Sequence, residues 1–131
     1  MPKELFEFCL YTTIHPDKLK WAAYLRGPST FEVRQRMVKV REYFRIAKAQ
    51  DKVVAVLFSD STNCIDLIYW ARLIHISVQG NNTHFTVSHI SKLEPERKID
   101  ALVKVSNGRK LSKKFIRPYA VVKKPSFLPN T

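Results

Sequence analysis

Glycine and cysteine are both scarce in this chain, which has only three Gly and two Cys in 131 residues. Few glycines argue against a glycine-rich phosphate loop and against flexible linkers. Cys9 and Cys64 lie far apart and neither belongs to a CxxC pair, so the sequence carries no zinc or thioredoxin-like motif. This cysteine usage predicts a reduced, intracellular protein.

Long apolar runs are also absent. No segment approaches the roughly 18 apolar residues that a membrane-spanning helix needs. The first residues, Met-Pro-Lys-Glu-Leu, lack the basic start and the apolar stretch of a signal peptide. We therefore expect a cytoplasmic protein with no membrane partner.

Catalytic and metal-binding patterns are weak. His84 and His89 fall in one predicted strand, where the five-residue step between them places them on opposite faces, so they cannot share a metal within that strand. No local signature supplies a base for Cys9 or Cys64, and paired carboxylates with a metal-ligand spacing are lacking. We expect no catalytic residue, no metal and no cofactor, with an RNA-processing enzyme on the same scaffold as the alternative.

Acidic residues are few, since 11 Asp and Glu stand against 23 Lys and Arg, which gives a formal net charge of +12. Such an excess most often reflects a polyanionic partner, nucleic acid before membrane. A basic proteome, colloidal solubility or an acidic protein partner are the alternatives.

The positive charge is concentrated in two blocks, residues 18–52 and 97–124, with a charge-poor stretch between them. If the two blocks pack side by side, they form one positively charged stripe that can bind successive phosphates of a nucleic-acid backbone. The competing interpretation is a charged face that is only exposed to solvent. Aromatics among cations, as at Phe115 and Tyr119, suit single strands and flipped bases. The predicted nucleic-acid-binding residues are Arg34, Arg41, Arg109, Lys110, Lys113, Lys114 and Arg117.

The composition that remains is globular, with 45% hydrophobic and 11% aromatic residues. A chain of this length is suited to one core and too short for two ordinary ones, which predicts a single domain over residues 1–131. Within it we distinguish the basic C-terminal segment 97–124 and a loose tail, 125–131.

Local patterns predict the elements of the first half. Residues 5–13 alternate in the period of a strand, and Pro16 beside Asp17 begins a short helix that extends to Leu25. Ser29 and Glu32 match a capping box, which predicts the start of a basic amphipathic helix there. The second half of that helix, residues 40–46, is also compatible with a strand.

Residues 52–58, 65–78 and 83–93 read as three strands of an antiparallel meander, joined by turns at 59–63 and 79–82. The middle strand has apolar residues on both faces, as expected of a barrel wall covered by a helix. After Pro95 we expect one or two helical turns, and a short strand among the basic residues that follow.

This order of elements resembles the PUA-like β-barrel group, which includes the ASCH, EVE and YTH domains. The resemblance covers residues 5–93. It rests on the first strand with its polar tip Tyr11-Thr12-Thr13, on Asp51 at the acidic position of the turn that enters the second strand, and on residues 68–73 as the returning strand. The sequence departs from the group at Gln50, where a Gly is usual.

The resemblance implies an α+β fold, a small mixed, mainly antiparallel PUA-like β-barrel with flanking helices. It also implies a pocket near the end of the first strand that in relatives receives a nucleotide base, often modified. Residues around that strand exit are the pocket candidates, although large aromatics such as Trp21 are also common packing residues. The candidates are Tyr11, Thr12, Thr13, Trp21, Tyr24 and Ser29. Together these observations predict a non-enzymatic nucleic-acid-binding module, for RNA or DNA, whose oligomeric state stays open.

Overall fold

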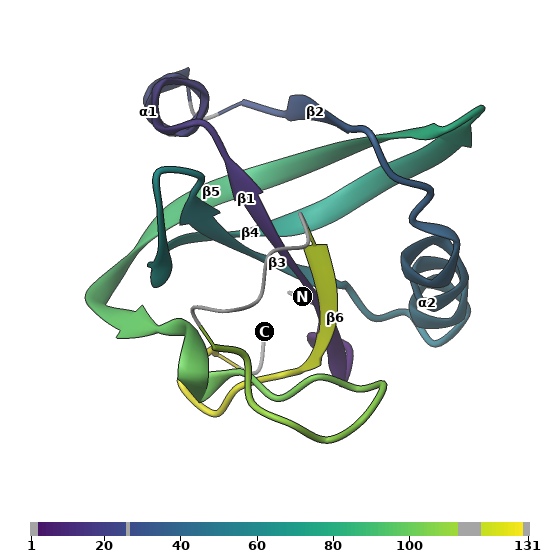
Figure 1. Ribbon diagram of the computed structural model, residues 1–131. Coiled ribbons are helices and arrows are strands. Elements are labelled where there is room, and N and C mark those ends of the chain that lie inside the picture. The colour runs from purple at the N-terminus through teal and green to yellow at the C-terminus, as the bar shows by residue number, and fades with distance from the viewer. Residues whose placement is uncertain (1–2, 26, 113–118, 130–131) are drawn as a thin grey trace.

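The computed structural model describes residues 3–25, 27–112 and 119–129 (Figure 1). Strands and two α-helices alternate in the first half, and strands dominate the second, so the predicted α+β class is confirmed. In chain order the elements are β1 (Phe8–Ile14), α1 (Pro16–Leu25), β2 (Ser29–Val33), α2 (Val38–Ala49), β3 (Ala55–Asp60), β4 (Asn63–Gln79), β5 (Asn82–Lys98), the 3-10 turn η1 (Ile99–Ala101) and β6 (Tyr119–Lys123).

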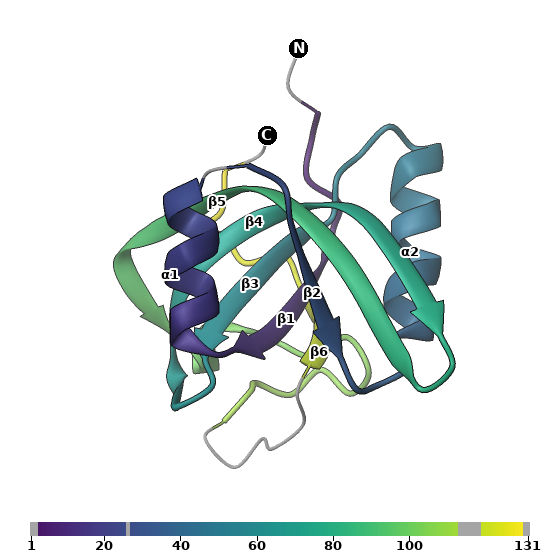
Figure 2. The same ribbon diagram turned by 90° about the horizontal axis from the view of Figure 1, so that it is seen from above.

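The strands form one six-stranded sheet in the order β2-β5-β4-β3-β1-β6. The β1–β3 pair is parallel and the other pairs are antiparallel. The predicted meander is confirmed as β3, β4 and β5, and the predicted first helix as α1. Figure 2 shows α1 and α2 at opposite ends of the curved sheet.

The sheet is open, with β2 and β6 at its two ends, whereas the sequence pattern predicts a barrel. The outer edge of β6 is occupied, because Val105 N–H donates to Val121 O at 3.0 Å and Lys123 N–H donates to Val103 O at 2.9 Å. The backbone groups on the outer edge of β6 are therefore already hydrogen-bonded, so β2 cannot pair with β6 to close a barrel. The Tyr119 hydroxyl, in β6, still donates to Arg36 O at 3.5 Å, so a side chain links β6 to the connection between β2 and α2.

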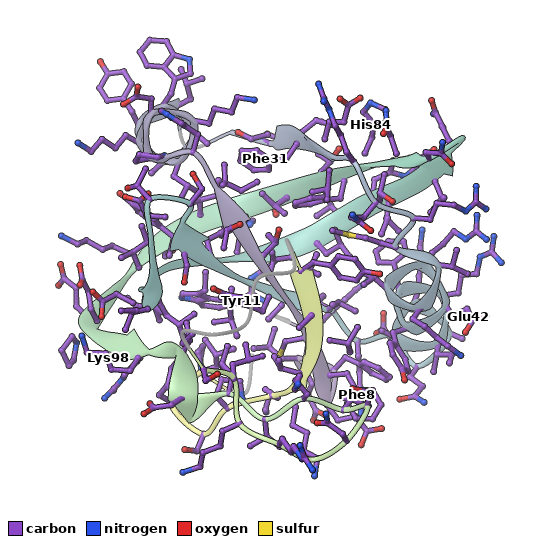
Figure 3. All side chains as sticks on the ribbon, in the orientation of Figure 1. Phe8, Tyr11, Phe31, Glu42, His84 and Lys98 are labelled. Carbon is purple, nitrogen blue, oxygen red and sulfur yellow. The ribbon has the colours of Figure 1, made fainter. Side chains whose placement is uncertain are left out.

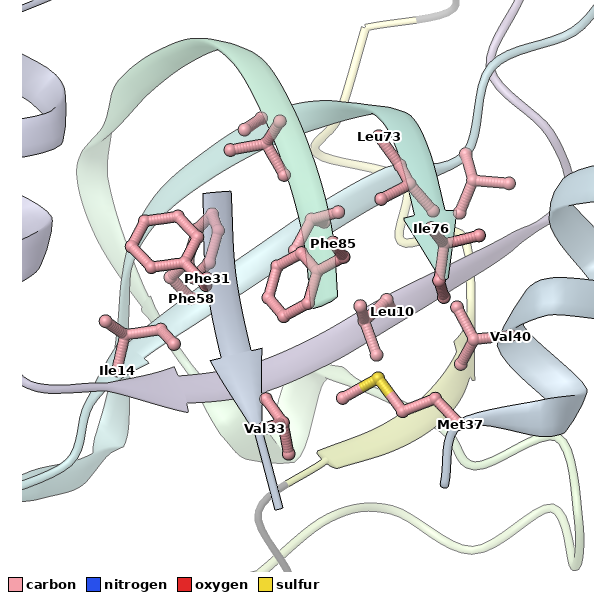
Figure 4. Close-up of a cluster of buried hydrophobic side chains, with 14 of the residues drawn as sticks. Leu10, Ile14, Phe31, Val33, Met37, Val40, Phe58, Leu73, Ile76 and Phe85 are labelled. Carbon is pink, nitrogen blue, oxygen red and sulfur yellow. The ribbon is translucent and has the colours of Figure 1, made fainter. Parts of the chain in front are cut away.

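Both faces of the sheet are covered by buried apolar side chains. In β3, Val56 and Phe58 belong to one cluster, while Ala55 and Leu57 belong to another on the opposite face, as the strand period requires. Figure 4 shows the first cluster, to which β2 contributes Phe31 and Val33 and α2 contributes Val40. Its labelled members are Leu10, Ile14, Phe31, Val33, Met37, Val40, Phe58, Leu73, Ile76 and Phe85.

The second cluster shows how the C-terminal segment is held. Its buried side chains include Leu67 of β4, together with Ile99, Leu102, Leu111 and Leu128 from the chain after β5. The prediction that the middle strand is buried on both sides is thus correct from Leu67 to Ala71, but not at Leu73, where the neighbouring Ile74 is exposed. The outer cover, however, is this irregular segment and not a helix.

The predicted helix start at Ser29 is wrong, because residues 29–33 form β2 and pair with β5. Phe31 and Val33 are buried on one side, which is the period of a strand. Glu32 does not close a capping box; its Oε2 lies 2.8 Å from Nε2 of His84, its partner directly across the ladder. The helix begins only at Val38.

The predicted connection at residues 59–63 contains the hairpin turn between β3 and β4, which is formed by residues 61–62. Asp60 Oδ1 accepts hydrogen bonds from the backbone N–H and the hydroxyl of Thr62, both at 2.7 Å. The buried Ser59 hydroxyl donates to Asp66 O at 2.7 Å. These polar groups thus stabilise the turn, as Asp, Ser and Thr commonly do.

We predict that the C-terminal segment contributes to the core and is not an appendage. Replacing buried Leu102 or Leu111 by Ala should lower the free energy of unfolding by about 2 to 5 kcal/mol, because each change leaves a cavity. Urea denaturation followed by circular dichroism measures this. The exposed neighbour change Lys110→Ala is the control and should stay within about 0.5 kcal/mol. Two leucine variants as stable as the unsubstituted chain would contradict the assignment.

Candidate nucleic-acid interface

Helix α2 presents cations because its apolar residues are used for packing. Val40 and Ala47 are buried, and Tyr43 contacts Phe8 of β1 with ring centroids 4.9 Å apart. Arg41, Arg45 and Lys48 follow one another at helical spacings of four and three, so they share a side of the helix. Figure 3 shows nitrogen-tipped side chains projecting outward around α2.

Two hollows lie beside this side of α2, between the helix and the β4–β5 hairpin. The first hollow has a volume of about 480 Å³ and the second hollow about 500 Å³. Both are lined by Phe44 and Lys48, so they adjoin, and we call them together the cationic groove. The first hollow is lined by Arg41, Phe44, Arg45, Lys48, Ala49, His75 and Ile76. The second hollow is lined by Lys3, Phe44, Lys48, Lys52, Val53, Arg72, Leu73, Ile74, Ser88 and His89.

The cations of the groove are largely uncompensated. Only Lys3 pairs with a carboxylate, through an Nζ to Asp51 Oδ1 distance of 3.1 Å; over residues 3–25, 27–112 and 119–129 no other cation of the groove forms an ion pair. The buried Nε of Arg41 has no hydrogen-bond partner in the described part of the chain. Unpaired guanidinium and ammonium donors are well suited to bind phosphate or carboxylate oxygens.

Two of these cations are supported by aromatic rings. The Arg72 guanidinium lies over Trp70, 5.5 Å from the ring centroid, and Lys48 Nζ lies 5.8 Å from the centroid of Phe44. A cation over a ring face is attracted by the ring quadrupole, which restricts where the charge can sit. The charges of Arg72 and Lys48 in the groove are therefore restricted to positions over their rings.

Of the seven predicted phosphate-binding residues, the structure places Arg41 in the cationic groove. Arg34 is exposed between β2 and α2 and lines neither hollow. Arg109 and Lys110 are exposed in the C-terminal segment, and none of its described residues lines the groove. Lys113, Lys114 and Arg117 lie outside the described residues.

The six predicted pocket residues do not surround a common opening. Tyr11 and Thr12 are 1% and 0% exposed, because both faces of β1 are covered, and Tyr11 lies in the interior in Figure 3. Trp21 and Tyr24 are 63% and 76% exposed on α1, with their ring centroids 5.8 Å apart in a stacked arrangement. Thr13 and Ser29 are half-buried. No base could reach Tyr11 or Thr12 in this arrangement.

Sequence reasoning missed most of the groove. Arg45 was visible on the basic helix, but the contributions of Arg72, His75 and His89 come from the meander, whose overall charge is low. The only local signal was the spacing of the α2 cations around Phe44. The tertiary packing of α2 against β4 then brings the other residues to them.

Among the described residues, the Cys9 thiol is a candidate nucleophile, and the His, Cys, Asp and Glu side chains are candidate metal ligands. Cys9 is buried, and this burial raises the pKa of its thiol to about 12, with Lys124 opposing the shift. A thiol with so high a pKa is a poor nucleophile near neutral pH. Among the described residues no cluster of three His, Cys, Asp or Glu could hold a metal, and no helix is long and apolar enough to cross a bilayer.

The raised pKa of Cys9 predicts a loss of stability at alkaline pH. The unfolded thiol ionises above pH 9, while the folded thiol stays neutral until about pH 12, so this stabilisation is present below pH 9 and is lost as the pH rises toward 12. One pH unit above 9 should cost about 1 kcal/mol. Urea unfolding at pH 8 and pH 10, compared between the unsubstituted chain and Cys9→Ala, measures this contribution. An identical pH dependence in both would contradict it.

Comparison with protein-family models, with curated proteins and with solved structures finds no significant match for this chain.

Proposed function

We propose that this protein binds nucleic acid, as a non-enzymatic module, through the cationic groove between α2 and the β4–β5 hairpin. The observation that carries the proposal is the convergence of unpaired cations from separate elements on one surface. Arg41, Arg45 and Lys48 come from α2, Lys52 from the connection to β3, and Arg72 from β4. Cations arranged in this way suit a chain of phosphates.

The groove also has an apolar component that favours nucleic acid over a simple acidic peptide. Phe44 lines both hollows, and Ile74 is one of the large apolar side chains that are exposed. Single-stranded nucleic acids combine regularly spaced phosphates with flat apolar bases, so they use both features at once. An acidic protein would pair its carboxylates with the Lys and Arg side chains, but it has no bases to pack against the apolar side chains.

We further propose that the fold is a PUA-like barrel that stays open. The support is the succession of elements along residues 5–93 and the curvature that brings Arg36 within hydrogen-bonding distance of Tyr119. The base site expected for that group would then lie away from the end of β1, since Tyr11 and Thr12 are closed to solvent.

The proposal predicts strongly salt-dependent binding to short RNA or DNA oligonucleotides. If about four phosphates are bound, affinity should fall roughly 100-fold between 50 and 200 mM salt, because counterions are released on binding. The triple variant Arg45→Gln, Lys48→Gln, Lys52→Gln should weaken binding to all sequences about equally and reduce the salt slope by about 1 for each phosphate-binding cation removed. Fluorescence anisotropy of a labelled oligonucleotide over a salt series measures both effects.

A matched control removes the same charge elsewhere. Lys18, Lys20 and Lys92 are exposed and line neither hollow, so their joint replacement by Gln should change affinity far less. The variant Lys110→Gln, Lys113→Gln, Lys114→Gln tests the C-terminal block that the sequence indicated. Equal losses in the groove variant and the control would show nonspecific charge attraction, and no binding at low salt would refute the proposal.

A further inference from the structure

The second hollow concentrates more positive charge than one internal phosphate requires. Lys48, Lys52 and Arg72 line it without a carboxylate partner among the described residues, and Lys3 adds a charge shared with Asp51. An internal phosphodiester carries one negative charge. A phosphomonoester carries about −1.5 to −2 at pH 7 and has three exposed oxygens that accept hydrogen bonds.

One rim of the second hollow is built by an irregularity of the backbone. His89 has a φ of +57°, which is uncommon for a residue other than glycine. It lies where the β4–β5 register shifts between the pairs Trp70–Ser91 and Arg72–Ser88. Bulges and unusual backbone conformations of this kind often redirect a side chain beside a functional site.

The His89 ring has a hydrogen-bond contact to the neighbouring Ser88. Its Nδ1 lies 2.9 Å from the Ser88 hydroxyl oxygen, so one ring nitrogen is engaged within the rim. Nε2 is the nitrogen that can donate to a ligand when the Ser88 hydroxyl donates to Nδ1. The rim therefore supplies an imidazole N–H donor, in addition to the lysines and Arg72.

Besides cations for a phosphate, the second hollow has apolar side chains against which a base could lie. Phe44, Val53, Leu73 and Ile74 line it, and its volume is about 500 Å³. Flat apolar surface next to cations is the usual setting for an unpaired nucleotide, because stacking and phosphate contacts act together. A nucleotide at the end of a strand stacks on only one neighbour, so it enters the hollow with less loss of stacking than an internal nucleotide, which stacks on two.

We infer that the second hollow binds the terminal phosphomonoester of a nucleic-acid strand, with the end nucleoside against Phe44 and Ile74. This inference rests on the proposed function and adds its substrate class, a phosphorylated strand end. The lysines and Arg72 neutralise the dianion, and His89 donates one further hydrogen bond.

The experiment compares three labelled single strands of one sequence, with a 5′-phosphate, a 3′-phosphate or hydroxyls at both ends. One phosphorylated end should bind at least about ten-fold more tightly than the hydroxyl ends, since charged hydrogen bonds are gained. The 5′- and 3′-arms show which end is recognised. A mononucleotide should compete better than its nucleoside, and inorganic phosphate should compete weakly.

Two variants localise the effect. Lys52→Gln removes one charge of the hollow, and His89→Asn removes the imidazole while keeping a residue that tolerates positive φ. Each should reduce the preference for the phosphorylated end by at least about five-fold, with a smaller effect on the hydroxyl-ended strand. Lys39→Gln is the matched control, because Lys39 is exposed, pairs with Glu42 at 3.6 Å and lines neither hollow.

The outcomes separate the two proposals. Equal affinity for all three strands, with steep salt dependence, would overturn the inference and leave nucleic-acid binding intact. A preference for a phosphorylated end that persists in both Lys52→Gln and His89→Asn would also overturn it, by placing the site elsewhere. Failure of every strand to bind at low salt would refute both proposals.

Discussion

The parallel pair β1 and β3 sets the main constraint on this structure, because both of its faces are apolar. Leu10 and Val56 point to one face, and Tyr11 and Leu57 to the other. A strand pair buried on both sides needs cover on both sides, since exposed apolar surface is unfavourable in water. Segments far apart in the sequence provide that cover, and their placement decides where the charged residues lie.

The cover on the first face positions the cationic groove. Met37 and Val40 anchor the start of α2 over the sheet, and Ala47 anchors its end. The remaining side of the helix faces the β4–β5 hairpin, which extends as two strands of 17 residues each. Lys48 and Arg72 thus line the same hollow because the core holds both elements, and Arg45 lines the adjoining one.

The cover on the second face explains why the described part of the C-terminal basic block, residues 97–112 and 119–124, does not line the groove. Leu102 and Leu111 draw the C-terminal segment against the side of the sheet that carries Tyr11 and Leu67. The exposed Arg109 and Lys110 follow their buried neighbours to that side. Net charge alone therefore did not show where the cations lie, because the apolar anchors of each segment determine which face of the sheet they reach.

Local patterns in the sequence were sufficient to predict the helix from Pro16 to Leu25 and the meander with its turns, because turn chemistry and side-chain period act between near neighbours. They were insufficient at residues 29–33, where Ser29 and Glu32 fit a helix cap as well as a strand. Pairing with β5 and burial of Phe31 decided for the strand. The open sheet, the closure of β1 to solvent and the cationic groove likewise depend on contacts between distant segments. Only the tertiary structure decided these features, because long-range packing sets which side chains are buried and which converge.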